Sequence, residues 1–186
     1  IKQLIQLGAD VNGRNQSGYT SLQKSIIYNK NTENVLTLIA VGANINTRNN
    51  AGSNSLHIAV TYNNSQAAYE LIKAGVDVNA RNVLGETALH ILMRGEDTKL
   101  IQLLIDNKSN VNAQDCSGDT ALHLAIQRSN VVAIKILLQN KAKISIYNLS
   151  DESFNWFTKK NMAISLMVGW GETADNLLFY GEIIRA

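Results

Sequence analysis

Hydrophobic residues recur along the chain at helical spacing, in pairs of short stretches separated by breaks. Leu89, Leu92 and Met93 stand at i, i+3 and i+4, which places them on one face of a helix. Residues 95–97, Gly-Glu-Asp, interrupt this pattern, and the same spacing then returns at Ile101, Leu104 and Ile105. Thr87 precedes the first stretch and is suited to cap its free N–H groups. We therefore expect a helix–turn–helix unit in this part of the chain.

This unit occurs four times at a nearly constant offset. Glycines that lie 34, 33 and 33 residues apart mark the copies, at Gly18, Gly52, Gly85 and Gly118. An Asn preceded by Val or Ile keeps the same step, at Asn12, Asn46, Asn79 and Asn112. Units that repeat at this period bury their apolar faces against their neighbours. The pattern predicts an all-α solenoid with four repeats, at residues 15–48, 49–81, 82–114 and 115–147.

A turn, two short helices and a Thr-x-Leu-His phrase at this period resemble the ankyrin repeat, over about residues 1–147. The resemblance implies stacked helix–turn–helix units with protruding turns, and it gives the histidines of the phrase a structural hydrogen-bonding role. Gln23 replaces the histidine in the first copy. The family's Pro is replaced in every copy, by Ser21, Ser55, Ala88 and Ala121. Because Pro in the first helical turn preorganises a helix without being essential, we expect these replacements to affect stability and not the fold.

Both ends of the chain depart from the repeat. Residues 1–14 correspond to the end of a truncated repeat, so we expect more protein before Ile1. The repeat weakens from Asn148, and all three Phe and both Trp of the chain lie between Phe154 and Phe179. For residues 148–186 two interpretations stay open: a degenerate, aromatic-rich helical cap, or the start of another module or docking surface.

Composition narrows the function classes. The 186 residues carry a net charge of +2 with acids and bases interspersed, which argues against a general nucleic-acid binder. No apolar run has the length needed to span a bilayer, so we expect no membrane span. Cys116 is the only cysteine, which excludes an intramolecular disulfide and favours a reducing compartment, in the cytoplasm or the nucleus.

Catalytic and metal chemistry have no candidates within the repeats. The three histidines, His57, His90 and His123, all occupy the repeated phrase, and we expect them on adjacent helices about 8–10 Å apart. Donor atoms must lie about 2 Å from a zinc ion, so we expect no shared metal site. With these histidines in structural roles, none is left to act as a general base. Cys116 lies in a predicted turn without a cationic neighbour, and we expect an exposed, unreactive thiol. The sequence predicts no catalytic residue, metal or cofactor.

The resemblance implies a binding surface made of the turn tips and the exposed side of the first helices, which together form a concave strip. Tyr28 and Tyr62 occupy equivalent positions on adjacent repeats, which predicts neighbouring aromatic anchors. Val83 and Leu84 place two apolar side chains at a turn tip, where polar residues are usual.

A row of basic residues runs beside these anchors, at Arg14, Arg48 and Arg81. Three guanidinium groups at the repeat step suit the carboxylates of an acidic peptide, and the alternative is that they bond nearby turn carbonyls. The predicted partner-binding residues are Tyr19, Tyr28, Arg48, Tyr62, Arg81, Val83, Leu84, Glu86, Arg94, Asp119 and Arg128.

We expect a protein–protein interaction scaffold without enzymatic activity, whose protein partner carries an acidic segment. The Asn-, Ile- and Lys-rich composition is similar to that of proteins from AT-rich genomes, including intracellular bacteria whose ankyrin proteins act inside host cells. A host-directed effector is therefore one hypothesis. The alternatives are the targeting arm of a larger enzyme whose catalytic domain precedes Ile1, and a purely structural spacer. The context of Asn79 also resembles the ankyrin sites that an asparaginyl hydroxylase of animal cells modifies.

Overall fold

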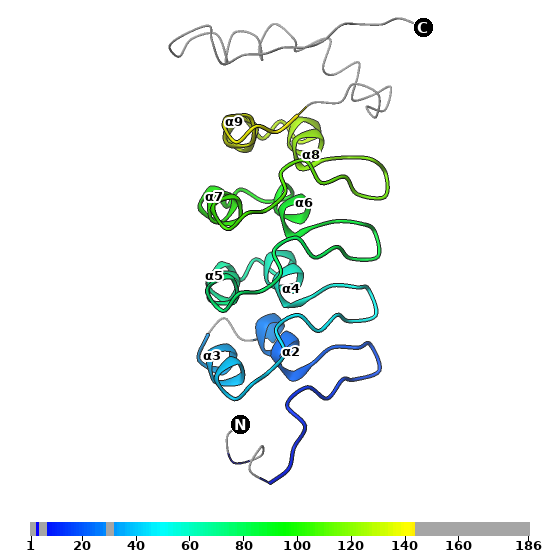
Figure 1. The fold of residues 1–186 in the computed structure, drawn as a ribbon, viewed down its shortest axis with the longest axis vertical. Coiled ribbons are helices and arrows are strands. Elements are labelled where there is room, and N and C mark those ends of the chain that lie inside the picture. Colours follow the sequence, from blue (N-terminus) through cyan, green and yellow to red (C-terminus); the bar gives the residue numbers. More distant parts are fainter. Residues whose placement is uncertain (1–2, 4–6, 29–31, 144–186) are drawn as a thin grey trace, which may run out of the picture. The chain divides into compact units, whose positions relative to one another are not determined.

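The computed structural model describes residue 3, residues 7–28 and residues 32–143 (Figure 1). The chain divides into two units, Ile1–Leu149 and Ser150–Ala186, and every described residue belongs to the first. The expectations for the aromatic segment 148–186, and for most of the truncated repeat before Asp10, lie outside the described residues.

The described residues form four pairs of antiparallel helices, as the repeat pattern predicts. In each pair a first helix precedes a second helix, and the two kinds form two parallel columns in Figure 1. The first helices are α2 (Ser21–Tyr28), α4 (Ser55–Thr61), α6 (Ala88–Leu92) and α8 (Ala121–Gln127). The second helices are α3 (Glu33–Ala40), α5 (Ser65–Lys73), α7 (Thr98–Asp106) and α9 (Val131–Gln139). The predicted all-α solenoid is confirmed.

Polar residues at fixed positions begin the helices and also hold neighbouring repeats together. Thr87 is the N-cap of α6, as expected. The second helices α5, α7 and α9 begin after Asn64, Asp97 and Asn130, whose side-chain oxygens each accept a backbone N–H of the first turn. The Asn64 amide also donates to the carbonyl of Ile26 in the preceding repeat, at 3.0 Å. The Asn64 side chain therefore both caps the N-terminus of α5 and forms a hydrogen bond to the preceding repeat.

The core is a continuous apolar layer between the two columns of helices. The leucine of the repeated phrase is fully buried in every copy, at Leu22, Leu56, Leu89 and Leu122. Each such side chain contributes about 1.5–3 kcal/mol through removal of its surface from water. In α7, Ile101 and Leu104 are buried as expected, whereas Ile105 is only half-buried because it lies at the margin of the inner face.

The loop tips require glycine. Gly85 has φ +74°, and a Cβ atom there would lie 2.8 Å from the Cys116 backbone nitrogen of the next repeat. Gly18 has φ +77° and would clash with Asn50 of its neighbour in the same way. The repeated glycine therefore allows both the left-handed turn and the close approach of successive tips.

Candidate protein-binding surface

The loops project from the column of first helices, and their tips follow one another along the array (Figure 1). We call the loop tips and the exposed parts of α2, α4, α6 and α8 the loop–helix strip. Backbone hydrogen bonds join successive tips: Asn50 N–H to Ser17 O at 3.2 Å, Val83 N–H to Ala51 O at 3.0 Å, and Cys116 N–H to Leu84 O at 2.9 Å. The strip is therefore a connected surface whose positions are fixed relative to one another.

Large apolar side chains are exposed on this strip where the sequence predicts anchors. Tyr28, the last residue of α2, is 73% exposed, and Tyr62, which caps the C-terminus of α4, is 49% exposed. At the third tip, Val83 is 64% exposed and Leu84 is 58% exposed. Tyr19 is half-buried beside the first tip.

The predicted row of arginines bonds to backbone carbonyls of the turns. Arg48 Nη1 donates to Arg81 O in the next repeat at 2.7 Å, and Arg81 donates to Gln114 O one repeat further on. Arg14 Nε donates to Gly18 O within its own turn at 3.1 Å. All three residues are exposed. The alternative that the sequence left open, bonding to turn carbonyls, is thus realised for each of them.

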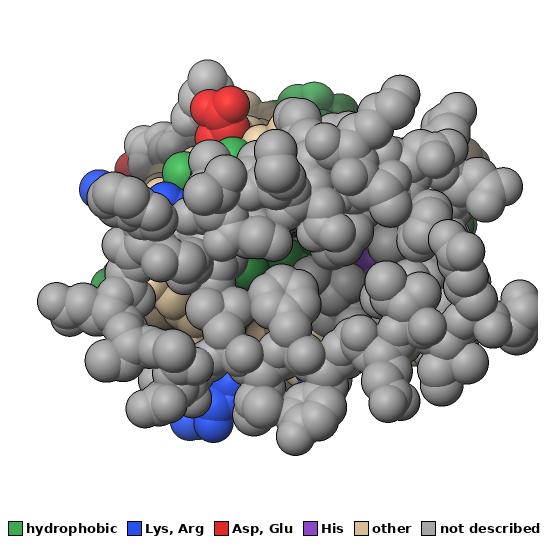
Figure 2. Space-filling view, turned by 90° about the horizontal axis from the view of Figure 1, so that it is seen from above, with side chains coloured by type: hydrophobic (Ala, Val, Ile, Leu, Met, Phe, Trp, Pro, Cys, Tyr) green, Lys and Arg blue, Asp and Glu red, His purple; other side chains and the backbone are tan. Residues whose placement is uncertain are grey.

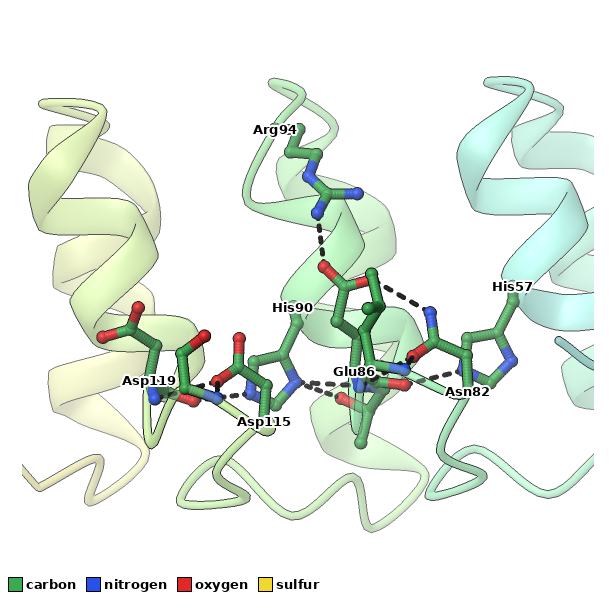
Figure 3. A network of polar contacts seen from close by, with 10 residues as sticks. His57, Asn82, Glu86, His90, Arg94, Asp115 and Asp119 are labelled. Atoms are coloured by element: carbon green, nitrogen blue, oxygen red, sulfur yellow. Dashed lines mark hydrogen bonds and ion pairs between the residues drawn. The ribbon is translucent and has the colours of Figure 1, made fainter. Parts of the chain in front are cut away.

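Glu86 was expected on the exposed part of the loop–helix strip. Its side chain is buried, so that expected exposure was wrong. The Glu86 carboxylate pairs with Arg94 and accepts a hydrogen bond from Asn82 Nδ2 at 2.9 Å (Figure 3). Glu86 precedes α6 and Arg94 follows it, so this ion pair joins the two ends of the helix. The carboxylate is buried next to a guanidinium that satisfies it, whereas Arg94 itself stays exposed.

His57 and His90 link neighbouring repeats through hydrogen bonds of their buried rings. His90 Nδ1 accepts the Thr87 backbone N–H at 3.1 Å, which leaves Nε2 to donate to Asp119 O of the next repeat at 3.2 Å. His57 follows the same pattern, with Nε2 3.0 Å from Glu86 O. Burial lowers the pKa of both rings below the usual value of 6.5, so they are neutral at pH 7. These positions are structural, as the resemblance implies.

Gln23 performs the same task in the first repeat. Its Oε1 accepts the Thr20 backbone N–H at 3.1 Å, and its Nε2 lies 2.7 Å from Thr47 O and 3.3 Å from Ser53 O of the next repeat, to both of which it donates. An amide presents one acceptor and one donor, as a neutral imidazole does. The replacement that looked like a departure from the repeat therefore preserves its hydrogen bonds.

The fourth repeat places acidic groups on the strip. Asp115 Oδ1 accepts the backbone N–H groups of Ser117 and Asp119, so Asp115 shapes the tip, as expected for a turn residue. Asp119 is half-buried, and desolvation, assisted by the negative charge of Asp115, raises its pKa above 3.8. Arg128 is exposed at the C-terminus of α8.

Cys116 is exposed at the fourth tip, as expected, with Sγ 3.9 Å from Val83 O. Within residues 7–28 and 32–143, no three His, Cys, Asp or Glu side chains gather in a way that would hold a metal ion. None of the helices in this part of the chain has the length and apolarity needed to cross a bilayer. On the face shown in Figure 2, the visible Lys and Arg side chains lie at separate points near the edge and form no single cluster.

Comparison with known proteins agrees with the geometry. A family model described as ankyrin repeats (3 copies) matches residues 1–82 and 56–148. No curated protein matches the chain in a sequence comparison. Ankyrin repeats generally mediate protein–protein interaction, and domains built from them are typically non-catalytic. The chain belongs to the ankyrin-repeat family.

Proposed function

We propose that this chain is an interaction scaffold that binds a protein partner through the loop–helix strip. The observation that carries the proposal is the exposure of Tyr28, Tyr62, Val83 and Leu84 on successive repeats of that strip. Tyrosine is enriched among the residues that dominate binding energy, because a large rigid ring is ordered at low entropic cost. Exposed apolar side chains at a loop tip are stabilised by contact with a partner that removes them from water.

The strip is also suited to binding because its backbone is held in place before a partner arrives. The hydrogen bonds between tips fix the loops, so less conformational entropy is lost on association. The second helices also expose large apolar side chains, at Leu36, Tyr69, Val131 and Val132. Those residues lie on the column from which no loop tip projects, and they supply a matched control surface.

The test begins with affinity capture and mass spectrometry to identify a binding protein, followed by titration of the purified pair. We expect the variant carrying Tyr62→Ala and Leu84→Ser to bind at least about 30-fold more weakly, the effect of losing an anchor worth about 2 kcal/mol. The control variant carries Tyr69→Ala and Val132→Ser on the second helices and should bind as the wild type does. Unchanged binding by the first variant, with its unfolding curve intact, would refute the proposal.

Two more specific hypotheses concern the role of this scaffold in the cell, and both are predictions. A host-directed effector rests on composition, and the alternative is the targeting arm of a larger enzyme. The full-length sequence distinguishes them, because the second requires a catalytic domain before Ile1.

A further inference from the structure

We propose that the first two repeats of the loop–helix strip bind an acidic polypeptide segment of the partner. This inference rests on the proposed function and specifies the chemistry of the partner. The loop and first helix of these two repeats, residues 10–28 and 44–62, contain three cations, Arg14, Lys24 and Arg48, and a single acid, Asp10, whose Oδ1 accepts the Asn12 backbone N–H at 2.9 Å. Neither of the ion pairs found among the described residues, Lys73–Glu70 and Arg94–Glu86, involves these three cations.

Lys24 is held between two aromatic rings. Its Nζ lies 5.2 Å from the ring centroid of Tyr19 and 5.1 Å from that of Tyr28. A cation over two ring faces is positioned without being neutralised, so the ammonium keeps its positive charge and its N–H donors for a carboxylate. Tyr19 precedes α2 and Tyr28 ends it, so the three side chains form an aromatic–cation–aromatic cluster along this helix.

Arg48 is also positioned without being neutralised. Its hydrogen bond to Arg81 O uses one N–H of a guanidinium that has five, and a carbonyl oxygen carries no net charge. Arg14 is oriented in the same way by Gly18 O. A guanidinium fixed on one side presents its remaining N–H groups in a defined direction, which suits the two oxygens of a carboxylate.

The other end of the strip is less basic. Arg94 is paired with Glu86, and the fourth repeat carries Asp115 and Asp119 together with the exposed Arg128. A uniformly charged polyanion such as a nucleic acid gains no favourable charge contact at this end, whereas a polypeptide is able to change its composition along its length. The acidic segment therefore fits the first two repeats, with apolar residues of the same partner placed at Val83 and Leu84.

The experiment selects a random-peptide library displayed on phage against the purified chain. We expect enriched peptides to be rich in Asp and Glu beside apolar or aromatic residues. The variant carrying Lys24→Gln and Arg48→Gln should bind a synthetic copy of the leading peptide at least about tenfold more weakly, since two charge-assisted contacts are lost. A control variant carrying Lys99→Gln and Lys135→Gln on the second helices loses the same charge and should bind as the wild type does.

A charge-preserving variant, Lys24→Arg with Arg48→Lys, separates lost charge from lost folding and should bind within a fewfold of the wild type. The inference is overturned if the enriched peptides show no acidic bias, or if Lys24→Gln with Arg48→Gln binds them unchanged. If such peptides still require Tyr62 and Leu84, the proposed function stands and only the partner's chemistry is wrong. A parallel selection uses a library of single-stranded oligonucleotides. If no peptide is enriched, or if only oligonucleotides are enriched, both the acidic-segment inference and the proposed function are overturned.

Discussion

At the scale of single residues, the same hydrogen bonds are made by different side chains. Gln23 and His90 each accept a backbone N–H at the start of a first helix and donate to the equivalent carbonyl of the next repeat, Ser53 O and Asp119 O respectively. An alignment of the repeats shows that Gln23 occupies the histidine position. It does not show that glutamine makes the same hydrogen bonds, because the bonding partners are backbone atoms, which do not depend on residue type. The position is defined by one acceptor and one donor at a fixed reach, and not by an imidazole.

This equivalence predicts the outcome of two substitutions at His90. We expect His90→Ala to lower the free energy of unfolding by about 2–3 kcal/mol, because two buried hydrogen bonds are lost and a helix end is uncapped. His90→Gln should lose less than about 1 kcal/mol, because an amide restores both bonds. Urea unfolding followed by circular dichroism measures both values. Equal losses for the two variants would show that the ring, and not its hydrogen bonds, is required.

The buried histidines also predict a dependence of stability on pH. Burial lowers the pKa of His57 and His90 in the folded chain, whereas the unfolded chain titrates near the ordinary value of 6.5. Below 6.5 the unfolded chain binds more protons, so the stability that is complete above this pH is lost progressively as the pH falls. Asp119 acts in the opposite sense at lower pH, since its pKa is raised above 3.8 in the folded chain.

We therefore expect the urea concentration at the midpoint of unfolding to decrease in the wild type when the pH is lowered from about 7.5 to about 5.5. The variant with His57→Gln and His90→Gln should show a flatter profile across the same range. A double variant that keeps the full pH dependence would assign it to other groups.

At the scale of the element, the sequence predicts well where the helices form, and predicts poorly which polar side chains beside them are exposed or paired. Apolar spacing and a polar cap determine where a helix forms, and Thr87 and Leu89 lie where that pattern places them. Glu86 was expected on the surface because the resemblance places its position on the loop–helix strip, yet it is buried and paired with Arg94. A contact between residues at the two ends of a helix depends on how both side chains pack in the folded chain, which local periodicity does not specify.

The loops offer a matched pair of glycines for testing their role. Gly75 has φ +81°, and a Cβ atom there would meet no other atom within 4 Å, so Gly75→Ala should cost only the left-handed backbone conformation, about 1–2 kcal/mol. Gly85 has a similar φ of +74°, but its Cβ would meet the backbone of the next tip. We expect Gly85→Ala to cost at least about 1 kcal/mol more by urea unfolding, since the tips must separate. Equal costs would mean that the tips contribute no inter-repeat packing.

At the scale of the whole array, stability depends on how strongly neighbouring repeats are coupled. The recurring asparagines form one set of links: Asn12, Asn46, Asn79 and Asn112 each accept a backbone N–H from the next repeat, at 2.7, 2.9, 2.7 and 2.6 Å. The sequence shows that these residues recur, and the structure gives the reason. A stacked array is stabilised by the repeats themselves and by the interfaces between them, so a weakened interface has a different effect at the centre than at the end.

Asn79 lies at the centre of the described array and makes two of these links, because its amide also donates to Lys108 O at 3.0 Å. We expect Asn79→Ala to lower the free energy of unfolding by about 1–3 kcal/mol and to reduce the slope of the urea transition, because the repeats on either side then unfold less cooperatively. Asn12→Ala, at the first interface, should lower stability while leaving the slope closer to that of the wild type. Asn79→Asp keeps the acceptor and loses the donor, so an intermediate effect is expected. If Asn79→Ala and Asn12→Ala give transitions of equal slope, coupling in this array does not pass through the asparagines, and the tips and helices alone carry it.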